Sequence, residues 1–416
     1  MVYYGALVYL LINTVEGLLR YTLLAAGLPF LIYSRDAFIV VVVLWFLLSG
    51  LRRRSCSLPL AIVLLIICFW SIIACKYVHN VRQTAFGIKL FLPHMLGIIA
   101  APALLDARKN TAKWIALLWL LAVSGVFFSA VVDVPWSGLS YEVGGVEIEG
   151  TRSWTIGGVP RLAGFGRSST EVAIQILFFA TYMVCFGRSR VLRLAVWIIS
   201  APALLLATTR AAIIAYGLVS LFLIVQAVLP SLECFWKQIL SVTAALMVVL
   251  PLIPSNSLDA LSRMSGGGVA NIKSLYMRME DTWPEAFDLL KQEGSPVFGR
   301  GIGGISIPQR LFEQEAHNPG DNLFLYLLLV FGWFSLAIII AIVIGLQALK
   351  LSGDMGSLFA FCAGLALFGI GLLLNGIEFS CPGVFVGAAF SYVFARLRRR
   401  IMECNSHRVY SFPPPP

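Results

Sequence analysis

The stretch EAHNPGDNLFLYLLLVFG, residues 315–332, passes directly from a polar cluster into an apolar run. The run continues to about residue 348, which is long enough to cross a bilayer as a helix. Inside a membrane the backbone must satisfy its own hydrogen bonds, and a helix does so. The stretch therefore predicts a membrane helix over 323–348. The polar residues at its mouth are His317, Asn318, Asp321 and Asn322.

Apolar runs of similar length recur along nearly the whole chain. Of the 416 residues, 59% are hydrophobic and only 12% are charged, which is typical of an integral membrane protein. The first run lacks the basic start and cleavage site of a signal peptide, so we expect an uncleaved insertion signal, tilted or broken near Pro29. We predict an all-α polytopic membrane protein with about twelve spanning helices, at 5–31, 35–51, 59–75, 86–105, 114–132, 170–187, 191–207, 211–229, 236–254, 323–348, 357–375 and 379–396.

Clusters of basic residues follow the second, fourth, sixth and twelfth expected helices. Short cytoplasmic loops are enriched in Lys and Arg, and all four clusters share one side if both termini are cytoplasmic. We therefore attribute the net charge of +10 to the basic loops that set the membrane orientation, and not to nucleic-acid binding. Two long loops, 133–169 and 255–322, are then extracytoplasmic. The remaining units are membrane helices over 1–132, 170–254 and 323–396, and a disordered cytoplasmic tail over 397–416.

The second long loop contains two local signals. A helix is expected over 270–293, begun by Asn271 or Ser274 and ended by Gly294. After it, the sequence GRGIGG at 299–304 is similar to a phosphate-binding glycine loop. No strand precedes it and no P-loop lysine follows it, so we interpret it as a flexible turn.

His317 is the candidate general base. A neutral imidazole on the external side can accept a proton from a hydroxyl group, since its ordinary pKa lies near the working pH. The alternative is a capping or loop histidine. Asp321 and Asn322 are good N-cap residues for the following helix, and Asp321 is also placed to orient the imidazole.

Several arginines are expected on the external side, against the usual bias towards cytoplasmic positive charge, among them Arg161, Arg167, Arg210 and Arg278. A guanidinium group binds phosphate oxygens through two parallel hydrogen bonds and stays charged, which points to an anionic ligand. The alternative is a set of solvated or phospholipid-contacting residues. Arg300 and Arg310 are expected to be of this second kind.

Other polar residues predict no cofactor. Glu16 and Arg20 stand four residues apart in the first helix, where an ion pair lowers the cost of burial. We favour a structural role for this pair, with Lys89 nearby, over a proton path. No DxD or HExxH motif occurs, and the eight cysteines show no CxxC spacing, so no metal site or disulfide framework is expected.

Several segments together resemble the O-antigen ligase and O-antigen polymerase (Wzy) superfamily, in the family's order. PRLAGFGRSSTEVA carries Arg161, ATTRAAIIAYG carries Arg210, and YMRMEDTWPEAFDLLKQEGSPVFGRGIGG carries Arg278. AHNPGDNLFLYLLLVFGWFSL carries His317, but it departs from the family's pattern by inserting Pro319 and Gly320. The early segments NTVEGLLRY and YSRDAF are more similar to exopolysaccharide-polymerase relatives than to lipid A-core ligases.

The resemblance implies a GT-C-type glycosyltransferase in the bacterial inner membrane, with a periplasmic active site. Its donor would be an undecaprenyl-diphosphate-linked glycan, and it would be inverting and metal-independent. His317 would be the base, and Arg161 and Arg278 would stabilise the leaving diphosphate. The substrate-binding residues implied are Arg167, Arg210, Asn318, Asp321 and Asn322.

The partners implied are an acceptor glycan or lipid, membrane lipids and a chain-length regulator. Two alternatives stay open. One is an O-antigen ligase that transfers the glycan to a lipid A core through the same residues. The other is a lipid-linked glycan flippase or transporter, which favours charged residues along a path at the middle of the membrane.

Overall fold

The computed structural model describes residues 2–52, 57–106, 110–143, 146–156, 159–254 and 273–409. Within these ranges nine helices are long and apolar enough to cross a membrane, or ten if the bent pair α1 (Val2–Thr14) and α2 (Glu16–Ala25) is one span. The chain is therefore a multi-pass helical membrane protein. The nine are α3 (Ser34–Arg52), α4 (Leu58–Tyr77), α5 (Val81–Leu104), α6 (Thr111–Val131), α7 (Ser169–Phe186), α8 (Arg190–Ala207), α9 (Arg210–Val228), α10 (Glu233–Val249) and α18 (Ser380–Val409).

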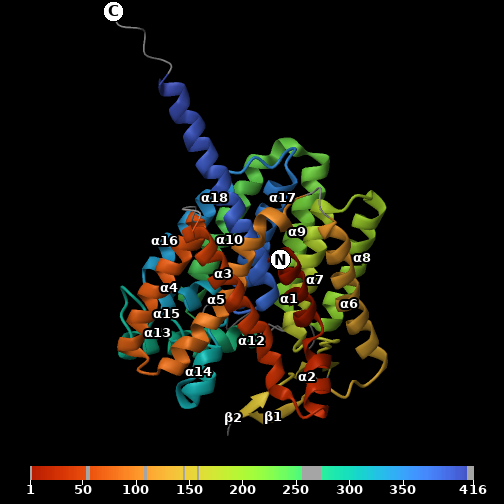
Figure 1. The fold of residues 1–416 in the computed structure, drawn as a ribbon, viewed down its shortest axis with the longest axis vertical. Coiled ribbons are helices and arrows are strands. Elements are labelled where there is room, and N and C mark those ends of the chain that lie inside the picture. The colour runs from red at the N-terminus through yellow and green to blue at the C-terminus, as the bar shows by residue number, and fades with distance from the viewer. Residues whose placement is uncertain are drawn as a thin grey trace, which may run out of the picture.

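The centre of the bundle is formed by α5, α7, α18 and the shorter apolar helix α17 (Met355–Gly371) (Figure 1). The backbones of α5 and α18 approach closely, since a Cβ on Gly97 would lie 2.1 Å from the Val384 carbonyl oxygen. Likewise, a Cβ on Gly387 would lie 2.1 Å from the His94 carbonyl oxygen. Small residues at such crossings let membrane helices pack through their backbones.

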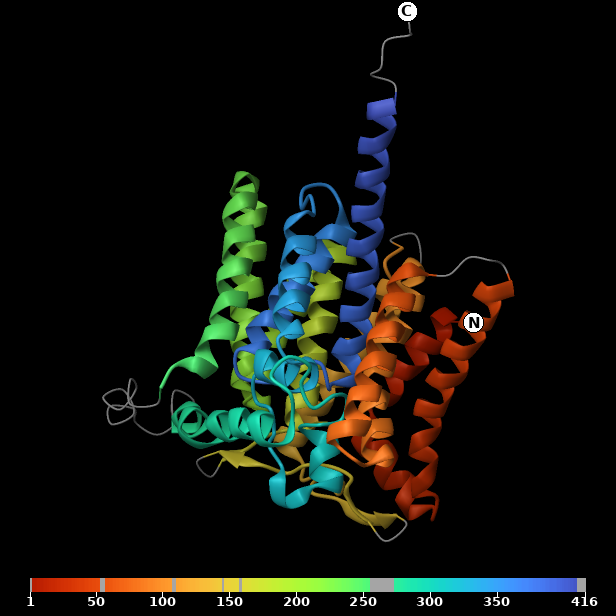
Figure 2. The same ribbon diagram turned by 90° about the vertical axis from the view of Figure 1, so that its left-hand side faces the viewer.

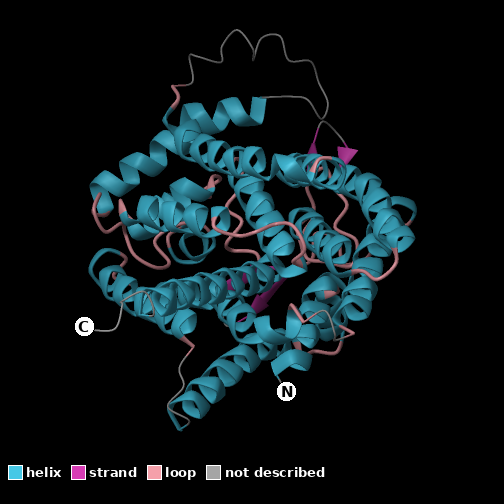
Figure 3. Cartoon of the chain, turned by 90° about the horizontal axis from the view of Figure 1, so that it is seen from above, coloured by secondary structure: helices cyan, strands magenta, loops and turns pink. Residues whose placement is uncertain are grey.

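The two long loops gather at one end of the bundle, opposite the end of α18 (Figures 1 and 2). The first loop forms two short antiparallel hairpins, which an all-α prediction did not include. Viewed from above, the strands occupy only small areas among the helices (Figure 3). The second forms a helix that lies across the bundle (Figure 2). The elements are β1 (Ser140–Val143), β2 (Val146–Glu149), β3 (Thr155–Ile156), β4 (Val159–Pro160), α12 (Lys273–Met277), a π-helical turn (Arg278–Thr282), α13 (Trp283–Glu293) and α14 (Ile307–Phe312).

The first expected helix is interrupted near Pro29, as predicted, because α2 ends at Ala25 ahead of a separate 3₁₀ turn over Pro29–Tyr33. It is also broken at Val15, with a 77° bend between α1 and α2. The reason is a contact from the first long loop. The Phe165 carbonyl oxygen enters the break and accepts hydrogen bonds from the Gly17 and Leu18 amides at 2.9 and 3.2 Å. Helical backbone donors that would otherwise lack partners are thus satisfied by the loop.

The helix expected over 323–348 is also divided, into α15 (Leu323–Phe331) and α16 (Phe334–Gln347). Gly332 lies between them with φ of 60°, and a Cβ there would lie 2.2 Å from the Val297 carbonyl oxygen. Only glycine accommodates this approach at low cost. The last helix is longer than predicted, because α18 continues past residue 396 to Val409.

The helix of the second loop ends at Glu293, before Gly294, as the sequence predicted. Its predicted cap Asn271 lies outside the described residues. The glycine-rich turn that follows is packed against helices, so the prediction of a flexible turn was wrong. Added Cβ atoms would lie 2.5 Å from the Val330 carbonyl oxygen at Gly299 and 2.3 Å from the Ala74 nitrogen at Gly301.

Candidate functional site

A cavity of about 670 Å³ lies where the long loops meet the helix ends. Its wall is built from five separate parts of the chain, so the site exists only in the assembled fold. Those parts are 152–171, 208–214, 274–278, 306–321 and 373–379. Six of the residues predicted for the site lie in this wall: Arg161, Arg167, Arg210, Arg278, His317 and Asp321.

Arg161 is held in the wall by neutral groups. Its Nη2 donates to the hydroxyl oxygens of Thr170 at 3.1 Å and Thr209 at 3.0 Å, and its guanidinium lies 5.3 Å from the Trp154 ring centroid. Arg161 forms no ion pair with any described residue. Burial and the like charges of Arg210 and Arg278 lower its pKa. A cluster of guanidinium groups without a carboxylate on Arg161 favours an anionic ligand.

Arg278 and Arg210 face the same cavity from different elements. Arg278 is the first residue of the π-helical turn, a distortion that often occurs at functional sites. Its Nε donates to Asp321 Oδ2 at 2.9 Å. Arg210 begins α9, and its Nη1 donates to Ser274 Oγ at 3.1 Å. These contacts fix both guanidinium groups beside Arg161.

The His317 side chain is half-buried and follows the short turn Gln314–Ala316. Burial and the positive charges of Arg310 and Arg152 lower its pKa, although Asp321 opposes them. The imidazole is therefore neutral at neutral pH, the form that accepts a proton. Within the described ranges no hydrogen bond joins His317 to Asp321, whose carboxylate instead pairs with Arg278.

Backbone strain is concentrated at the cavity. Thr208 (φ 51°) and Ser306 (φ 65°) both line it, and they are two of three non-glycine residues with positive φ in the described chain. Such conformations cost free energy and cluster at functional sites.

Unpaired polar atoms are concentrated there as well. Five cavity-lining side chains contain a buried polar atom with no hydrogen-bond partner, which is the pattern of a site that binds a polar ligand. These atoms are Arg161 Nε, Arg167 Nε, Thr208 Oγ1, Asn375 Nδ2 and Glu378 Oε1.

Asn318 and Asn322 are not part of the cavity wall. Asn318 is buried, and its Nδ2 donates to the Thr282 carbonyl oxygen at 2.7 Å. The Asn322 side chain caps α15 and its Nδ2 donates to the carbonyl oxygens of Met247 at 3.1 Å and Leu372 at 3.2 Å. Both side chains hold the loop and helix ends together in this structure.

The two arginines expected to be ordinary surface residues differ from that expectation. Arg300 is only 1% exposed and pairs with Glu293 at 2.7 Å and Glu313 at 3.2 Å, so it is a buried structural residue. Arg310 lies in the cavity wall and pairs with Glu149 at 2.5 Å. The other charged wall residues that sequence reasoning missed are Arg152, Glu171 and Glu378.

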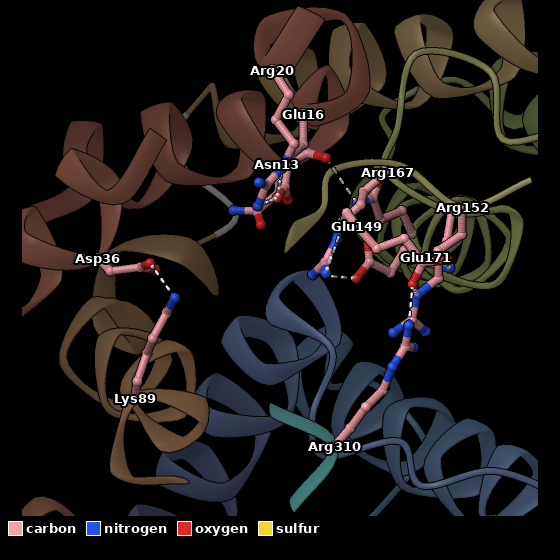
Figure 4. A network of polar contacts seen from close by, with 12 residues as sticks. Asn13, Glu16, Arg20, Asp36, Lys89, Glu149, Arg152, Arg167, Glu171 and Arg310 are labelled. Carbon is pink, nitrogen blue, oxygen red and sulfur yellow. Dashed lines mark hydrogen bonds and ion pairs between the residues drawn. The ribbon is translucent and has the colours of Figure 1, made fainter. Parts of the chain in front are cut away.

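A buried ionic network lies beside the site (Figure 4). Glu16 pairs with Arg20 at 2.6 Å, as predicted, and also with Arg35. Lys89 pairs with Asp36 at 2.8 Å and not with the predicted pair. Opposite charges that satisfy one another lower the cost of burying each in a membrane protein, so these contacts are consistent with a structural role.

No group of three or more His, Cys, Asp or Glu side chains in the described ranges is arranged to hold a metal ion. Neither a scan against protein-family models nor a search of curated proteins found a match for this chain. The chemistry that the site can support therefore follows from its own residues: clustered guanidinium groups, a neutral imidazole and unpaired polar atoms.

Proposed function

We propose that this protein is a glycosyltransferase that polymerises undecaprenyl-diphosphate-linked repeat units into O-antigen or exopolysaccharide. It would act at the periplasmic face of the bacterial inner membrane. The observation that carries the proposal is the meeting of Arg161, Arg210 and Arg278 with His317 in one cavity. A diphosphate needs several cationic donors, and a sugar hydroxyl needs a base.

The membrane arrangement that goes with this function has about twelve spans and a GT-C-type architecture. It counts α1 with α2 as one span and α15 with α16 as another, and it includes α17. Both termini would be cytoplasmic, which places the cavity in the periplasm. The position of the cavity at the opposite end of the bundle from the end of α18 supports this orientation (Figure 2).

In the proposed reaction the acceptor hydroxyl attacks the anomeric carbon of the lipid-linked glycan. His317 accepts the hydroxyl proton, and the bond between the anomeric carbon and the diphosphate oxygen breaks. The electron pair stays on the lipid diphosphate, whose growing charge is stabilised by Arg161, Arg210 and Arg278. Attack from the face opposite the leaving group inverts the anomeric configuration.

Reconstitution in liposomes tests the proposal. Purified protein receives the lipid-diphosphate-linked repeat unit as the only sugar source, and His317→Ala is assayed beside it. A ladder of products from the wild type, absent from a folded His317→Ala variant, is the expected result. A folded variant with near-normal product would remove His317 from the role of base.

The same assay separates the alternatives. Transfer of a single glycan only after a lipid A core is added would indicate a ligase. Movement of the donor across the bilayer without any new glycosidic bond would indicate a transporter.

A further inference from the structure

One side of the cavity has a different character from the arginine cluster. The connector between α17 and α18 contributes the apolar side chains of Leu373, Leu374 and Phe379, together with the polar side chains of Asn375 and Glu378. Apolar surface with a few placed polar groups is the usual make-up of a small-molecule subsite. It also suits a sugar ring, which combines C–H faces with hydroxyl groups.

Glu378 lies in this wall without a cationic partner among the described residues. Its Oε2 accepts a hydrogen bond from Ser306 Oγ at 2.5 Å, while its Oε1 is buried and unpaired. Burial raises the pKa of the carboxyl to about 8. The group is then a neutral acid at neutral pH, able both to donate and to accept a hydrogen bond. Rotation about the last side-chain bond is soft and presents either oxygen to a ligand.

Asn375, three residues before Glu378, also has an unpaired polar atom, but here it is a hydrogen-bond donor. Its Oδ1 accepts from the Ile377 amide at 3.1 Å, but its Nδ2 has no partner although the side chain is only 5% exposed. An unpaired buried amide costs free energy, and a ligand oxygen would remove that cost. The two unpaired groups therefore offer a donor and a mixed donor–acceptor from one short segment.

We propose that Asn375 and Glu378 form a subsite that binds hydroxyl groups of a sugar ring. This inference rests on the proposed function, because the arginine cluster supplies the place for the diphosphate of the same substrate. An anion is a poor ligand for the connector itself, since its one ionisable group carries no positive charge in either protonation state. The cavity thus has a phosphate side and a sugar side.

The groups that face Glu378 determine how its protonation varies. Against the effect of burial, the Ser306 hydroxyl and the Ile307 backbone amide lower its pKa. Arg152 lowers it further, and Asp321 raises it. His317 lies in the same wall and is neutral at neutral pH. Sugar binding should therefore hold steady through neutral pH and weaken as Glu378 ionises above about pH 8.

Binding to the full-length protein in nanodiscs tests this. The probes are undecaprenyl diphosphate and undecaprenyl-diphosphate-linked N-acetylglucosamine, and the quantity of interest is the ratio of their dissociation constants. In the wild type the sugar should tighten binding about tenfold or more. Glu378→Ala and Asn375→Ala should each remove most of that gain and bind the bare carrier within about twofold of wild type, which also shows that they fold.

Glu378→Gln is the decisive variant, because the amide resembles the neutral acid and cannot ionise. It should keep the sugar-dependent gain and lose the decline above about pH 8. Glu315→Gln, the same change at an exposed loop position, is the matched control and should behave as wild type.

The outcomes separate this inference from the proposed function. A bare carrier that does not bind, or that binds equally well to Arg278→Ala, contradicts the proposed function. A carrier that binds through Arg278, with no gain from the sugar or with a gain that survives both alanine variants, overturns only the sugar subsite.

Discussion

Replacing Arg278 by lysine keeps the positive charge in the cavity but removes the planar guanidinium fork. In the structure one hydrogen bond, from Nε to Asp321 Oδ2 at 2.9 Å, orients this group. No other hydrogen bond joins its side chain to a described residue, so both terminal nitrogens are left for a ligand. A lysine ammonium is a point charge and cannot hold Asp321 while presenting two parallel donors to a diphosphate.

The size of the effect follows from the bond that is lost. A hydrogen bond to a charged group contributes about 1.5–3 kcal/mol, and lysine forfeits one of the two that the fork would form. If the bond strengthens as the diphosphate leaves, its loss slows transfer by about 10- to 150-fold. Arg278→Ala, which also loses the charge, should slow transfer further.

The assay is the initial rate of product formation from the lipid-diphosphate-linked donor in liposomes. The matched control is Arg190→Lys, because Arg190 is an exposed arginine at the far end of α8 from the cavity. A folded Arg278→Lys enzyme within about threefold of the wild-type rate would refute the bidentate role. So would an equal loss in the Arg190→Lys control.

Three further predictions concern pH and stability. Transfer should be lost on acidification only below the ordinary histidine pKa of 6.5, because burial and the charges of Arg310 and Arg152 disfavour the His317 imidazolium. Arg310→Gln should move the acidic limb of the pH–rate profile to higher pH. An unmoved limb contradicts the effect of Arg310 on the His317 pKa. Arg300→Met removes the buried partner of two partly exposed carboxylates and should destabilise the protein by about 1–3 kcal/mol. This would be seen as a lower thermal unfolding temperature in detergent, whereas an unchanged temperature argues against the ion-pair role. Asn322→Ala should cost about 1–3 kcal/mol by removing a helix cap and two bonds to buried carbonyls, with little change in rate per folded molecule; a loss of rate at full stability would place Asn322 in substrate binding instead.

The charged side of the site could be predicted from the sequence because its residues break a rule that the sequence displays. In the expected orientation, Arg161, Arg210 and Arg278 run against the bias of basic residues in short loops, and His317 closely precedes a membrane helix. Such exceptions can be recognised without coordinates. The membrane class of the fold could be predicted for the same reason, since long apolar runs are visible in the sequence.

The neutral side of the site could not be predicted in this way. Glu378 and Asn375 acquire their significance from burial and from missing partners, which only the assembled bundle defines. The break at Val15 likewise depends on a carbonyl group supplied by a loop about 150 residues later in the chain. Arg300 looked like a surface residue because its carboxylate partners come from the ends of two short helices, α13 and α14, that no periodic pattern connects.

The tightly packed turn at 299–304 lies just ahead of Ser306 and Ile307, which line the cavity. The turn packs by its backbone against α4, α5 and α15, so it anchors this edge of the wall to the helix bundle. Under the proposed function, a growing glycan would be far too large to be enclosed in about 670 Å³, so only its end would be bound at each step.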